Sequence, residues 1–423
     1  MATLDINQVR ACFPSLRSGH IYADNARGSQ TAQSVIDRIV DYLSNPNIQS
    51  GTDYSVANSQ RVVEGSIAVA ELFNAASLDE VGFGSSSTMI FENIARALEN
   101  DIQPGDEFII SYEHEANNGP WKRLAARRNA VVKYWQPTPV SAENPYSLTY
   151  KVEELLPLVS SRTRLAAINA CSNILGSLIP VKETVKALRQ RANEQGAKRL
   201  EVALDCVAYA SHRKLDVQEW DVDYCVFSVY KVFGAHNAAA YVRLAALERS
   251  LTSIAHDFLK VDDKPYKFQP GGPGHELVYG AAAIVPYLKS LTPEDDLAAS
   301  FNAIANHERE LLAPLLLFLT DAKQVDRGVR IVGTSEINLS RVPTVSFVVV
   351  GQNAIKSKDI VGAFEKKGGI SIQCGNFYSY HLIDNLRPKL DVNDGVVRIS
   401  FVHYNTVEEV EKVVDALREV LER

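Results

Sequence analysis

The segment Asp223-Tyr-Cys-Val-Phe-Ser-Val-Tyr-Lys231-Val-Phe-Gly234 indicates most directly which fold this chain adopts. Its apolar, β-branched and aromatic residues predict a buried strand over 224–229, and the glycine marks the turn that follows. The strand delivers Ser228, Tyr230 and Lys231 to its carboxyl end. Because a lysine there cannot easily extend its amine into bulk water, burial disfavours the charged form and leaves the amine available as a nucleophile. The alternative is a lysine at the exposed end of a core strand.

Strand-like runs alternate with helix-compatible segments from about residue 60 to 245, which predicts a doubly wound α/β sheet that is mostly parallel or mixed. Ligands of such sheets bind outside the carboxyl ends of the strands. Asp205 and Lys231 each end a predicted strand and Asn173 follows one, so we expect these three residues to meet in one crevice. The predicted strands span 107–112, 131–135, 164–170, 200–205 and 224–229, and the predicted helices span 59–74, 89–99, 118–128 and 181–194.

The last third of the chain has a different pattern, and a length of 423 residues already favours two domains. We expect a large α/β domain at 26–290 and a smaller α+β domain formed by 1–25 and 291–423. Residues 260–274, rich in Lys, Asp, Pro and Gly, are expected to form a long loop. Helices of the smaller domain are predicted at 297–319, 357–367 and 406–421, and its strands at 330–332, 344–350 and 395–402.

Composition and charge exclude several classes of function. The chain is 46% hydrophobic, and its 44 basic and 51 acidic residues give a net charge of −7, which argues against a nucleic-acid-binding surface. No apolar run reaches membrane-spanning length. The five cysteines are widely spaced and form no Cys-x-x-Cys pair, so we expect neither disulfides nor a metal site. The N-terminal segment lacks the features of a signal peptide, which predicts a cytoplasmic protein.

Three further residues supply groups that a pyridoxal phosphate site requires besides a lysine. That cofactor needs an anion at its pyridine nitrogen, a group stacked on its ring, a phosphate cradle, and a cation for the substrate carboxylate. Asp205 is a candidate for the anion because it ends a predicted buried strand. His114 follows another strand and could stack on the ring. Arg398 stands alone in an apolar strand and suits bidentate recognition of a carboxylate.

The phosphate cradle is predicted at Gly84-Ser-Ser-Ser87-Thr88, which precedes a helix. Small hydroxyl side chains and free backbone N–H groups at a helix N-terminus bind anions. Ordinary structural roles remain open for each of these candidates. Asp205 and Ser87 could cap helices. His114 could lie in a surface loop, and Arg398 could form a structural salt bridge.

Taken together, these segments resemble the class V, fold-type I pyridoxal phosphate enzymes, and specifically their cysteine desulfurase-like group. The resemblance covers nearly the whole chain. No single motif is specific, but their ordered combination is. The matching segments are Tyr22-Ala-Asp-Asn25-Ala, Tyr-Glu-His114-Glu-Ala-Asn, Cys-Ser-Asn173-Ile-Leu-Gly, Leu-Asp205, Ser-Val-Tyr-Lys231-Val-Phe-Gly and Val-Arg398-Ile-Ser-Phe-Val-His-Tyr-Asn-Thr.

The resemblance implies a role for each matched residue and a homodimer with active sites at the interface. By the family pattern, Lys231 holds pyridoxal 5'-phosphate as a Schiff base, Asp205 pairs with the pyridine nitrogen, and His114 stacks on the ring. The loop Pro270-Gly-Gly-Pro-Gly274 matches the segment that reaches the partner subunit's cofactor. Further cofactor contacts are implied for Asn173, Ser87, Thr88, Ser228, Tyr230 and Gly272, and substrate contacts for Arg398, Asn25 and Tyr378.

The departures from the desulfurase pattern concern sulfur transfer. Desulfurases carry a nucleophilic cysteine in a loop of the form Arg-Thr-Gly-x-x-Cys, whereas this chain has Gln373-Cys374-Gly375-Asn-Phe-Tyr378. Tyr378 thus stands at the cysteine position, and a phenol cannot accept sulfane sulfur. Cys374 lies four positions earlier, and a reactive thiol needs a tuned environment. Three cofactor contacts also differ from those of desulfurases: Tyr230 replaces a histidine, Ala208 a glutamine and Gly272 a threonine.

We therefore expect an enzyme that forms a cofactor-stabilised carbanion from an α-amino acid and joins it to a carbon electrophile by aldol or Mannich chemistry. Ala208 and the segment Ser-Phe-Val-His-Tyr-Asn-Thr-Val-Glu-Glu-Val resemble fungal biosynthetic members of the group. Examples are the decarboxylative aldolase of the ustiloxin pathway and the Mannich cyclase of loline alkaloid biosynthesis. The alternatives are C–S lyase or desulfurase activity without the usual loop cysteine, and a non-catalytic protein with the same fold.

Overall fold

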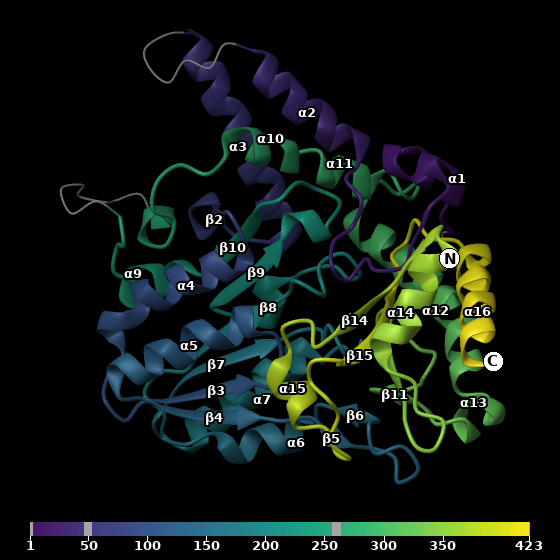
Figure 1. The fold of residues 1–423 in the computed structure, drawn as a ribbon. Helices are drawn as coiled ribbons and strands as arrows, with labels where there is room; N and C mark the ends of the chain where they lie inside the picture. Colours follow the sequence, from purple (N-terminus) through teal and green to yellow (C-terminus); the bar gives the residue numbers. More distant parts are fainter. Residues whose placement is uncertain (1–2, 46–52, 256–263, 423) are drawn as a thin grey trace.

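The computed structural model describes residues 3–45, 53–255 and 264–422, and its centre is a seven-stranded sheet (Figure 1). The strand order is β2-β10-β9-β8-β7-β3-β4. β10 runs antiparallel to both of its neighbours, while β9, β8, β7, β3 and β4 are parallel. The predicted mostly parallel, doubly wound α/β sheet is therefore confirmed. Its strands are β2 (Val81–Gly84), β3 (Glu107–Ser111), β4 (Val131–Trp135), β7 (Thr163–Asn169), β8 (Glu201–Asp205), β9 (Tyr224–Ser228) and β10 (Ala238–Val242).

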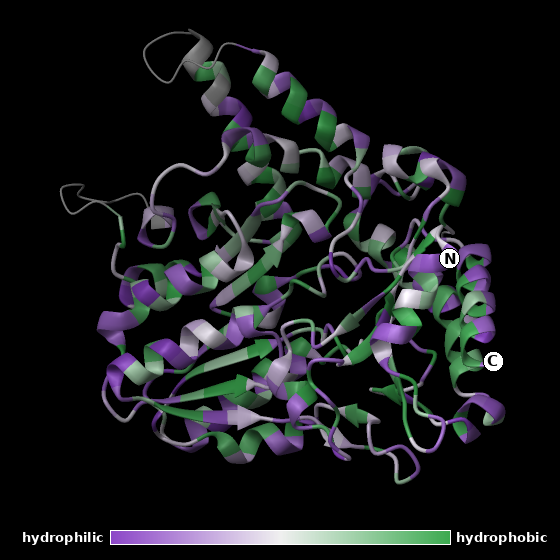
Figure 2. Cartoon of the chain, viewed as in Figure 1, coloured by the Kyte–Doolittle hydropathy of each residue, from purple (hydrophilic) through white to green (hydrophobic). Residues whose placement is uncertain are grey.

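Helices cover both faces of this sheet, so its central strands are buried along their whole length. Every residue of β3, β7, β8, β9 and β10 is buried, which explains their nearly continuous apolar sequences (Figure 2). One face packs against α4 (Ser87–Leu98), α5 (Glu115–Arg128) and α9 (Leu244–Arg249). The other packs against α3 (Asp53–Phe73), α7 (Val181–Glu194), α8 (Val217–Trp220) and α11 (Ile284–Lys289).

A second, antiparallel sheet with the order β11-β12-β15-β14 is built from the C-terminal part of the chain. The helix α12 (Leu297–Leu319) contributes Leu297 and Phe301 to the core of the large sheet and Leu311 to the core of the small one. The short strand β1 (Ile21–Tyr22) pairs with β13 (Ile370–Ser371), which ties the N-terminal segment to this region. The other elements here are β11 (Val329–Val332), β12 (Thr344–Val349), β14 (Gln373–Gly375), β15 (Val396–Ser400), α13 (Ala322–Asp326), α14 (Ser357–Lys367), α15 (Tyr380–Asp384) and α16 (Val407–Leu421).

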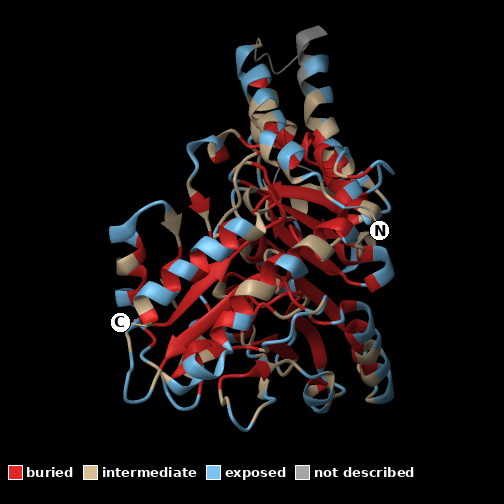
Figure 3. Cartoon of the chain, turned by 90° about the vertical axis from the view of Figure 1, so that its right-hand side faces the viewer, coloured by how far each residue is buried: buried red, intermediate tan, exposed pale blue. Residues whose placement is uncertain are grey.

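The helices α2 (Gln33–Ser44) and α3 project together beyond the large sheet and form a helical arm (Figures 1 and 3). Along this arm Val40, Leu43 and Ile67 expose 56%, 67% and 48% of their surface. The remaining elements are α1 (Ile6–Ala11), α6 (Val152–Leu155), α10 (His275–Ala281) and the hairpin strands β5 (Thr138–Pro139) and β6 (Leu148–Thr149). No helix within the described residues has the length and hydropathy to cross a bilayer.

Several predicted boundaries need correction. The helix predicted at 59–74 begins six residues earlier, at Asp53, and the helix predicted at 118–128 begins at Glu115 because His114 caps it. Strands β2 and β10 were not predicted. Of the loop predicted at 260–274, residues 260–263 lie outside the described residues, and Lys264–Lys267 form a single 3-10 turn. The division of the chain at residues 26 and 290 stays a prediction.

Candidate active site

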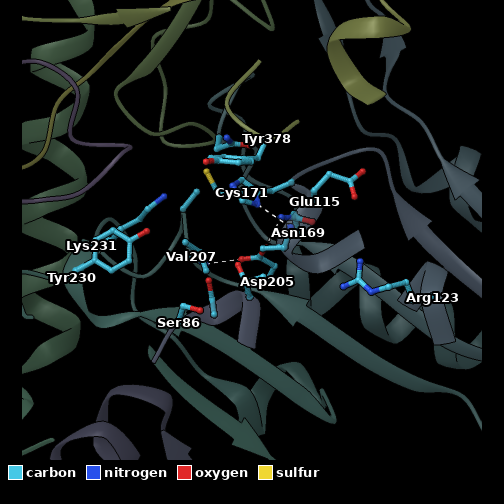
Figure 4. Close-up of a pocket in the computed structure, with 16 residues that line it drawn as sticks. Ser86, Glu115, Arg123, Asn169, Cys171, Asp205, Val207, Tyr230, Lys231 and Tyr378 are labelled. Atoms are coloured by element: carbon cyan, nitrogen blue, oxygen red, sulfur yellow. Dashed lines mark hydrogen bonds between the residues drawn. The ribbon is translucent and has the colours of Figure 1, made fainter. Parts of the chain in front are cut away.

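Four strands of the large sheet end in polar side chains at the same edge. These are Ser111 on β3, Asn169 on β7, Asp205 on β8 and Ser228 on β9. A cavity of about 450 Å³ opens at this edge, as expected for a doubly wound sheet (Figure 4). Its walls include Ser86, Ser87, Thr88, His114, Asn169, Cys171, Asn173, Asp205, Ala208, Tyr230, Lys231 and Tyr378.

Lys231 lies in a single 3-10 turn directly after β9, and its amine reaches the cavity. Burial and, to a smaller extent, the positive charge of Arg398 lower the pKa of the Lys231 amine to about 8, although Asp205 and Asp24 oppose this shift. A substantial fraction of the amine is therefore neutral near pH 8. Lys231 is therefore not the exposed strand-end lysine that the sequence left open as an alternative.

Asp205 is buried at the end of β8, with 3% of its surface exposed. Its carboxylate accepts hydrogen bonds from Asn169 Nδ2 at 3.0 Å and from the Val207 backbone N–H at 2.9 Å. Burial nevertheless raises the pKa of Asp205 to about 6, although these hydrogen bonds and Lys231 oppose the shift. A buried carboxylate with a raised pKa would be stabilised by a cation bound in the cavity.

His114 caps the N-terminus of α5, where its Nδ1 accepts a hydrogen bond from the Ala116 backbone N–H at 3.1 Å. The ring proton therefore resides on Nε2. Burial lowers the pKa of His114 to about 3, and the nearby cations Lys231 and Arg398 add to the effect, so the imidazole is neutral. The ring lies 5.5 Å from the ring of Tyr378 and lines the cavity, where its face is available for stacking.

The region predicted to hold phosphate lies at the start of α4. Ser86 caps this helix by accepting a hydrogen bond from the Met89 N–H at 3.2 Å, and Ser86, Ser87 and Thr88 all line the cavity. The buried Ser228 hydroxyl donates to Ser87 Oγ at 3.2 Å, which joins the end of β9 to this helix. Tyr230 lines the cavity and stacks on His236 with ring centroids 4.9 Å apart. Hydroxyl groups and a helix N-terminus thus converge as an anion site requires.

Arg398 lines a second cavity, of about 1070 Å³, which shares Ser86, His114, Asn173, Tyr230, Lys231 and Tyr378 with the first. Its guanidinium donates to Asp24 Oδ1 at 3.1 Å and to the Asn173 carbonyl at 3.3 Å. It also lies 3.7 Å from the centre of the Phe377 ring. Arg398 therefore forms an ion pair, the structural alternative left open by the sequence, and still faces the cavity.

The amide groups of Asn173 and Asn25 are engaged in structural hydrogen bonds. Asn173 Nδ2 donates to the Phe377 carbonyl at 3.1 Å, and its Oδ1 accepts from the Ser379 hydroxyl at 2.8 Å. Asn25 Nδ2 donates to the Tyr22 carbonyl at 2.7 Å, and its Oδ1 accepts from the Tyr404 hydroxyl. Both asparagines line the larger cavity, but these bonds tie together segments that are distant in sequence.

Tyr378 stands at the mouth of the cavity, with 72% of its surface exposed (Figure 4). It has a φ of +61° and Phe377 a φ of +48°, both in the left-handed region that bulky residues seldom adopt. The Tyr378 carbonyl accepts a hydrogen bond from the Glu115 N–H at 2.9 Å, and Asn173 holds Phe377. These bonds keep the strained loop in place against α5.

Neither cysteine near the two cavities has an activated thiol. Cys374, on β14, is half-buried, and burial raises its pKa. Cys171 is fully buried, and burial raises its pKa much further, with Glu113 adding to the effect. Both thiols are therefore protonated at neutral pH, whereas a sulfur nucleophile requires the thiolate.

Gly272 precedes α10 and is not among the described residues that line either cavity of a single chain. Its predicted contact with the cofactor phosphate of a partner subunit stays a prediction.

Three residues beside the predicted site were not predicted from the sequence. Asn169 donates to Asp205, and Asp24 accepts from Arg398. Glu113 is buried next to His114, and burial raises its pKa to about 8. Asn169 could have been found, because it ends the neighbouring strand in register with Asp205. The other two follow from tertiary packing, which no local pattern reveals.

Comparison with known proteins identifies the family. The model of the family described as aminotransferase class-V matches residues 21–413. The chain belongs to the class-V aminotransferase family. It is 36% identical over 427 residues to the aminotransferase-like protein FGM3 of Gibberella zeae, an alignment that covers 99% of both chains. It is 30% identical over 425 residues to the cysteine desulfurase-like protein ustD of Aspergillus flavus, across 99% of this chain and 91% of that one.

The class-V fold is also evident in solved structures. The cysteine desulfurase CsdA of Escherichia coli matches with a TM-score of 0.81 at 23% identity, covering 99% of both chains. The predicted enzyme family and its cofactor, pyridoxal 5'-phosphate, are thereby confirmed. The structure fits that cofactor, because the cavity offers a partly neutral lysine amine, a buried carboxylate in need of a cation, and a hydroxyl-rich helix N-terminus.

When bound, pyridoxal phosphate supplies an electron sink for bonds broken at the α-carbon of an amino acid. Lys231, Asp205 and the Ser86–Thr88 segment would hold it. Because the Lys231 amine has a pKa of about 8, it can accept a proton from a substrate and return it near neutral pH. His114 is neutral, so its Nε2–H can donate a hydrogen bond without placing a second positive charge beside Lys231.

Proposed function

We propose that this class-V enzyme joins the carbanionic carbon of an α-amino acid to a carbon electrophile in fungal-type secondary metabolism. The observation that carries the proposal is the absence of an activated thiol among the described residues lining the cavities. Tyr378 occupies the mouth of the cavity, and the pKa of Cys374 is raised by burial. Removal of sulfur from a substrate needs a thiolate nucleophile, so the lack of one argues against desulfuration. A carbanion formed by loss of a proton or a carboxylate can instead attack a carbon electrophile.

The size of the site supports a reaction between two substrates. The two cavities have volumes of about 450 and 1070 Å³ and share six lining residues. Single-ligand pockets commonly enclose roughly 300–1,000 Å³. The combined space therefore accommodates a cofactor, an amino acid and a further reactant. The similarity to proteins of Gibberella zeae and Aspergillus flavus supports a fungal biosynthetic setting.

The geometry of the two cavities supports the following proposed roles. Arg398 holds the α-carboxylate, Lys231 carries the cofactor and moves protons, and Asp205 pairs with the pyridine nitrogen. We further propose that His114 stacks on the cofactor ring. Tyr378 and Asn25 border the space into which the substrates extend.

The experiment is a screen of single α-amino acids with and without aldehyde acceptors, followed by mass spectrometry of the products. We expect a product that contains the carbons of both reactants and forms only when both are present. Lys231→Ala should abolish it, whereas Cys374→Ser should not. Release of sulfide and a keto acid from L-cysteine without any acceptor would instead favour the C–S lyase alternative.

A further inference from the structure

Arg27 lies in a segment that is held firmly between the two sheets. The Asn25 N–H donates to the Ser400 carbonyl at 3.2 Å, and the Ser29 N–H donates to the Tyr230 carbonyl at 3.2 Å. One anchor is thus the end of β15 and the other is the residue beside Lys231. Between them, the Arg27 N–H donates to the Asp24 carbonyl at 3.1 Å. The backbone from which the Arg27 side chain extends therefore has a fixed position in the wall of the larger cavity, which Lys231 also lines.

The Arg27 side chain lines the larger cavity, yet its guanidinium forms no ion pair or hydrogen bond with any residue that the structure describes. Arg398, in the same cavity, already has a partner in Asp24. Arg27 is also exposed, so it does not support the core. Asp24 attracts Arg27 electrostatically but bonds to Arg398. A planar group with five donors that faces a cavity with none of them used by a described residue is suited to bind an anion.

The charges of the larger cavity are unbalanced. Its described walls contain two arginines, Arg27 and Arg398, and one carboxylate, Asp24. Apart from Lys231, which carries the cofactor, the cavity therefore has an excess of one positive charge. An amino acid with an uncharged side chain enters as a zwitterion and leaves this excess in place. An amino acid with a second carboxylate neutralises it.

We infer that Arg27 binds a second carboxylate on the amino-acid substrate, so that the enzyme prefers acidic amino acids. The α-carboxylate lies at Arg398 and the side-chain carboxylate at Arg27. The inference rests on the proposed amino-acid role of Arg398, and it is independent of which bond the enzyme forms.

The test is a titration of the cofactor-loaded enzyme with acidic amino acids and their neutral isosteres, followed by the change in cofactor absorbance. The probes are L-aspartate against L-asparagine, and L-glutamate against L-glutamine. We expect wild-type enzyme to bind at least one acidic member about tenfold more tightly than its amide, the effect of one charge-assisted hydrogen bond. In Arg27→Ala this ratio should approach one. Arg27→Lys should retain part of the preference, and added salt should weaken it.

Arg17→Ala is the matched control, because Arg17 is exposed and is not among the residues lining the cavity. It removes the same charge from the protein and should leave the ratio unchanged. Equal affinities in wild-type enzyme would overturn the inference, as would an acidic preference that survives Arg27→Ala. The inference would also be contradicted if product formation depended on Arg27 only when the carbon acceptor, and not the amino acid, carries the carboxylate. Because binding is measured without turnover, failure to form a carbon–carbon bond would affect only the proposed function.

Discussion

At the scale of single residues, the Lys231 amine should set the pH dependence of cofactor attachment. Its pKa is lowered to about 8 by burial and by Arg398, and only the neutral amine attacks the cofactor aldehyde. Covalent attachment to cofactor-free enzyme should therefore speed up as the pH rises through about 8 and then level off. Absorbance during reconstitution measures this, and borohydride reduction with peptide mapping identifies the lysine. Removing the charge in Arg398→Gln should move the midpoint to higher pH.

The matched control for attachment is Lys122→Gln, which alters a lysine on α5 that pairs with Glu115. It should leave both the midpoint and the labelled peptide unchanged. A midpoint near 10.5, the ordinary value for lysine, would show that the amine is not desolvated in the cofactor-free enzyme.

Asp205 should destabilise the cofactor-free protein and stabilise the loaded one. Its pKa is raised from 3.8 to about 6, mainly by burial. The folded state therefore binds this proton more tightly than the unfolded state does, and stability is lost as the pH rises from below 4 to above 6. At pH 8, cofactor-free Asp205→Asn should be more stable than wild type by up to about 3 kcal/mol, at ~1.4 kcal/mol per pKa unit.

Denaturant unfolding at pH 8 and pH 5 checks this prediction, since the difference between the two proteins should shrink at pH 5 as Asp205 becomes protonated. The loaded mutant should at the same time exchange the α-hydrogen of its substrate more slowly, on the order of a hundredfold, because a neutral amide cannot keep the pyridine nitrogen protonated. If cofactor-free Asp205→Asn were less stable than wild type at pH 8, the buried carboxylate would not destabilise the folded protein and the prediction would be wrong.

The sequence predicted the site residues that end strands, because ligands of a doubly wound sheet bind at the carboxyl ends of its strands. Lys231 and Asp205 lie in the predicted cavity, and so does the Ser87–Thr88 pair, which was predicted from the start of a helix. The sequence did not predict that the charged side chains of Asp24 and Arg27 would lie in the same cavity as Arg398. Their positions depend on a loop that crosses between the sheets and is fixed by hydrogen bonds to Ser400 and Tyr230.

At the scale of elements, the strands that the sequence missed carry weak patterns. β2 reads Val-Gly-Phe-Gly, and two glycines in four residues predict a turn rather than a strand. β10 reads Ala-Ala-Ala-Tyr-Val, and alanine has little strand propensity. β10 forms between β9 and β2, and β2 forms by pairing with β10, so tertiary pairing overrides the weak local pattern. By contrast, β4 at the sheet edge and β8 in its interior, with β-branched residues or leucine, were located to within one residue.

The loop after β14 should lack sulfur-transfer activity. Tyr378 occupies the cavity mouth, and burial raises the pKa of Cys374. After incubation with L-cysteine, we expect little alanine and no persulfide on Cys374. Alkylation and mass spectrometry of the peptide 369–378 would detect one, and Cys374→Ser is the control. Rapid alanine production together with a Cys374 persulfide, both lost in the mutant, would restore the desulfurase alternative.

At the scale of the whole molecule, the site depends on contacts between the two sheets. Asp205 and Lys231 come from the large sheet and Arg398 from the small one, while the segment from Asp24 to Ser29 connects them. α12 packs into both cores, and Asn173 bonds to the loop that carries Phe377. In the proposed roles, substrate contacts and cofactor contacts are divided between the sheets. A change in the relative position of the sheets would then alter the distance between Arg398 and Lys231.

The helical arm of α2 and α3 should form part of a homodimer interface. Val40 and Leu43 on α2 are more than half exposed, and such apolar surface favours association. We expect the wild-type enzyme to sediment as a dimer and the Val40→Glu, Leu43→Glu double variant to dissociate towards monomer. Leu317→Glu is the matched control, because Leu317 is 63% exposed on the distant α12. If the 270–274 loop completes the partner's phosphate site, the dissociated variant should also bind the cofactor more weakly. A wild-type monomer that binds the cofactor at full strength would contradict both expectations.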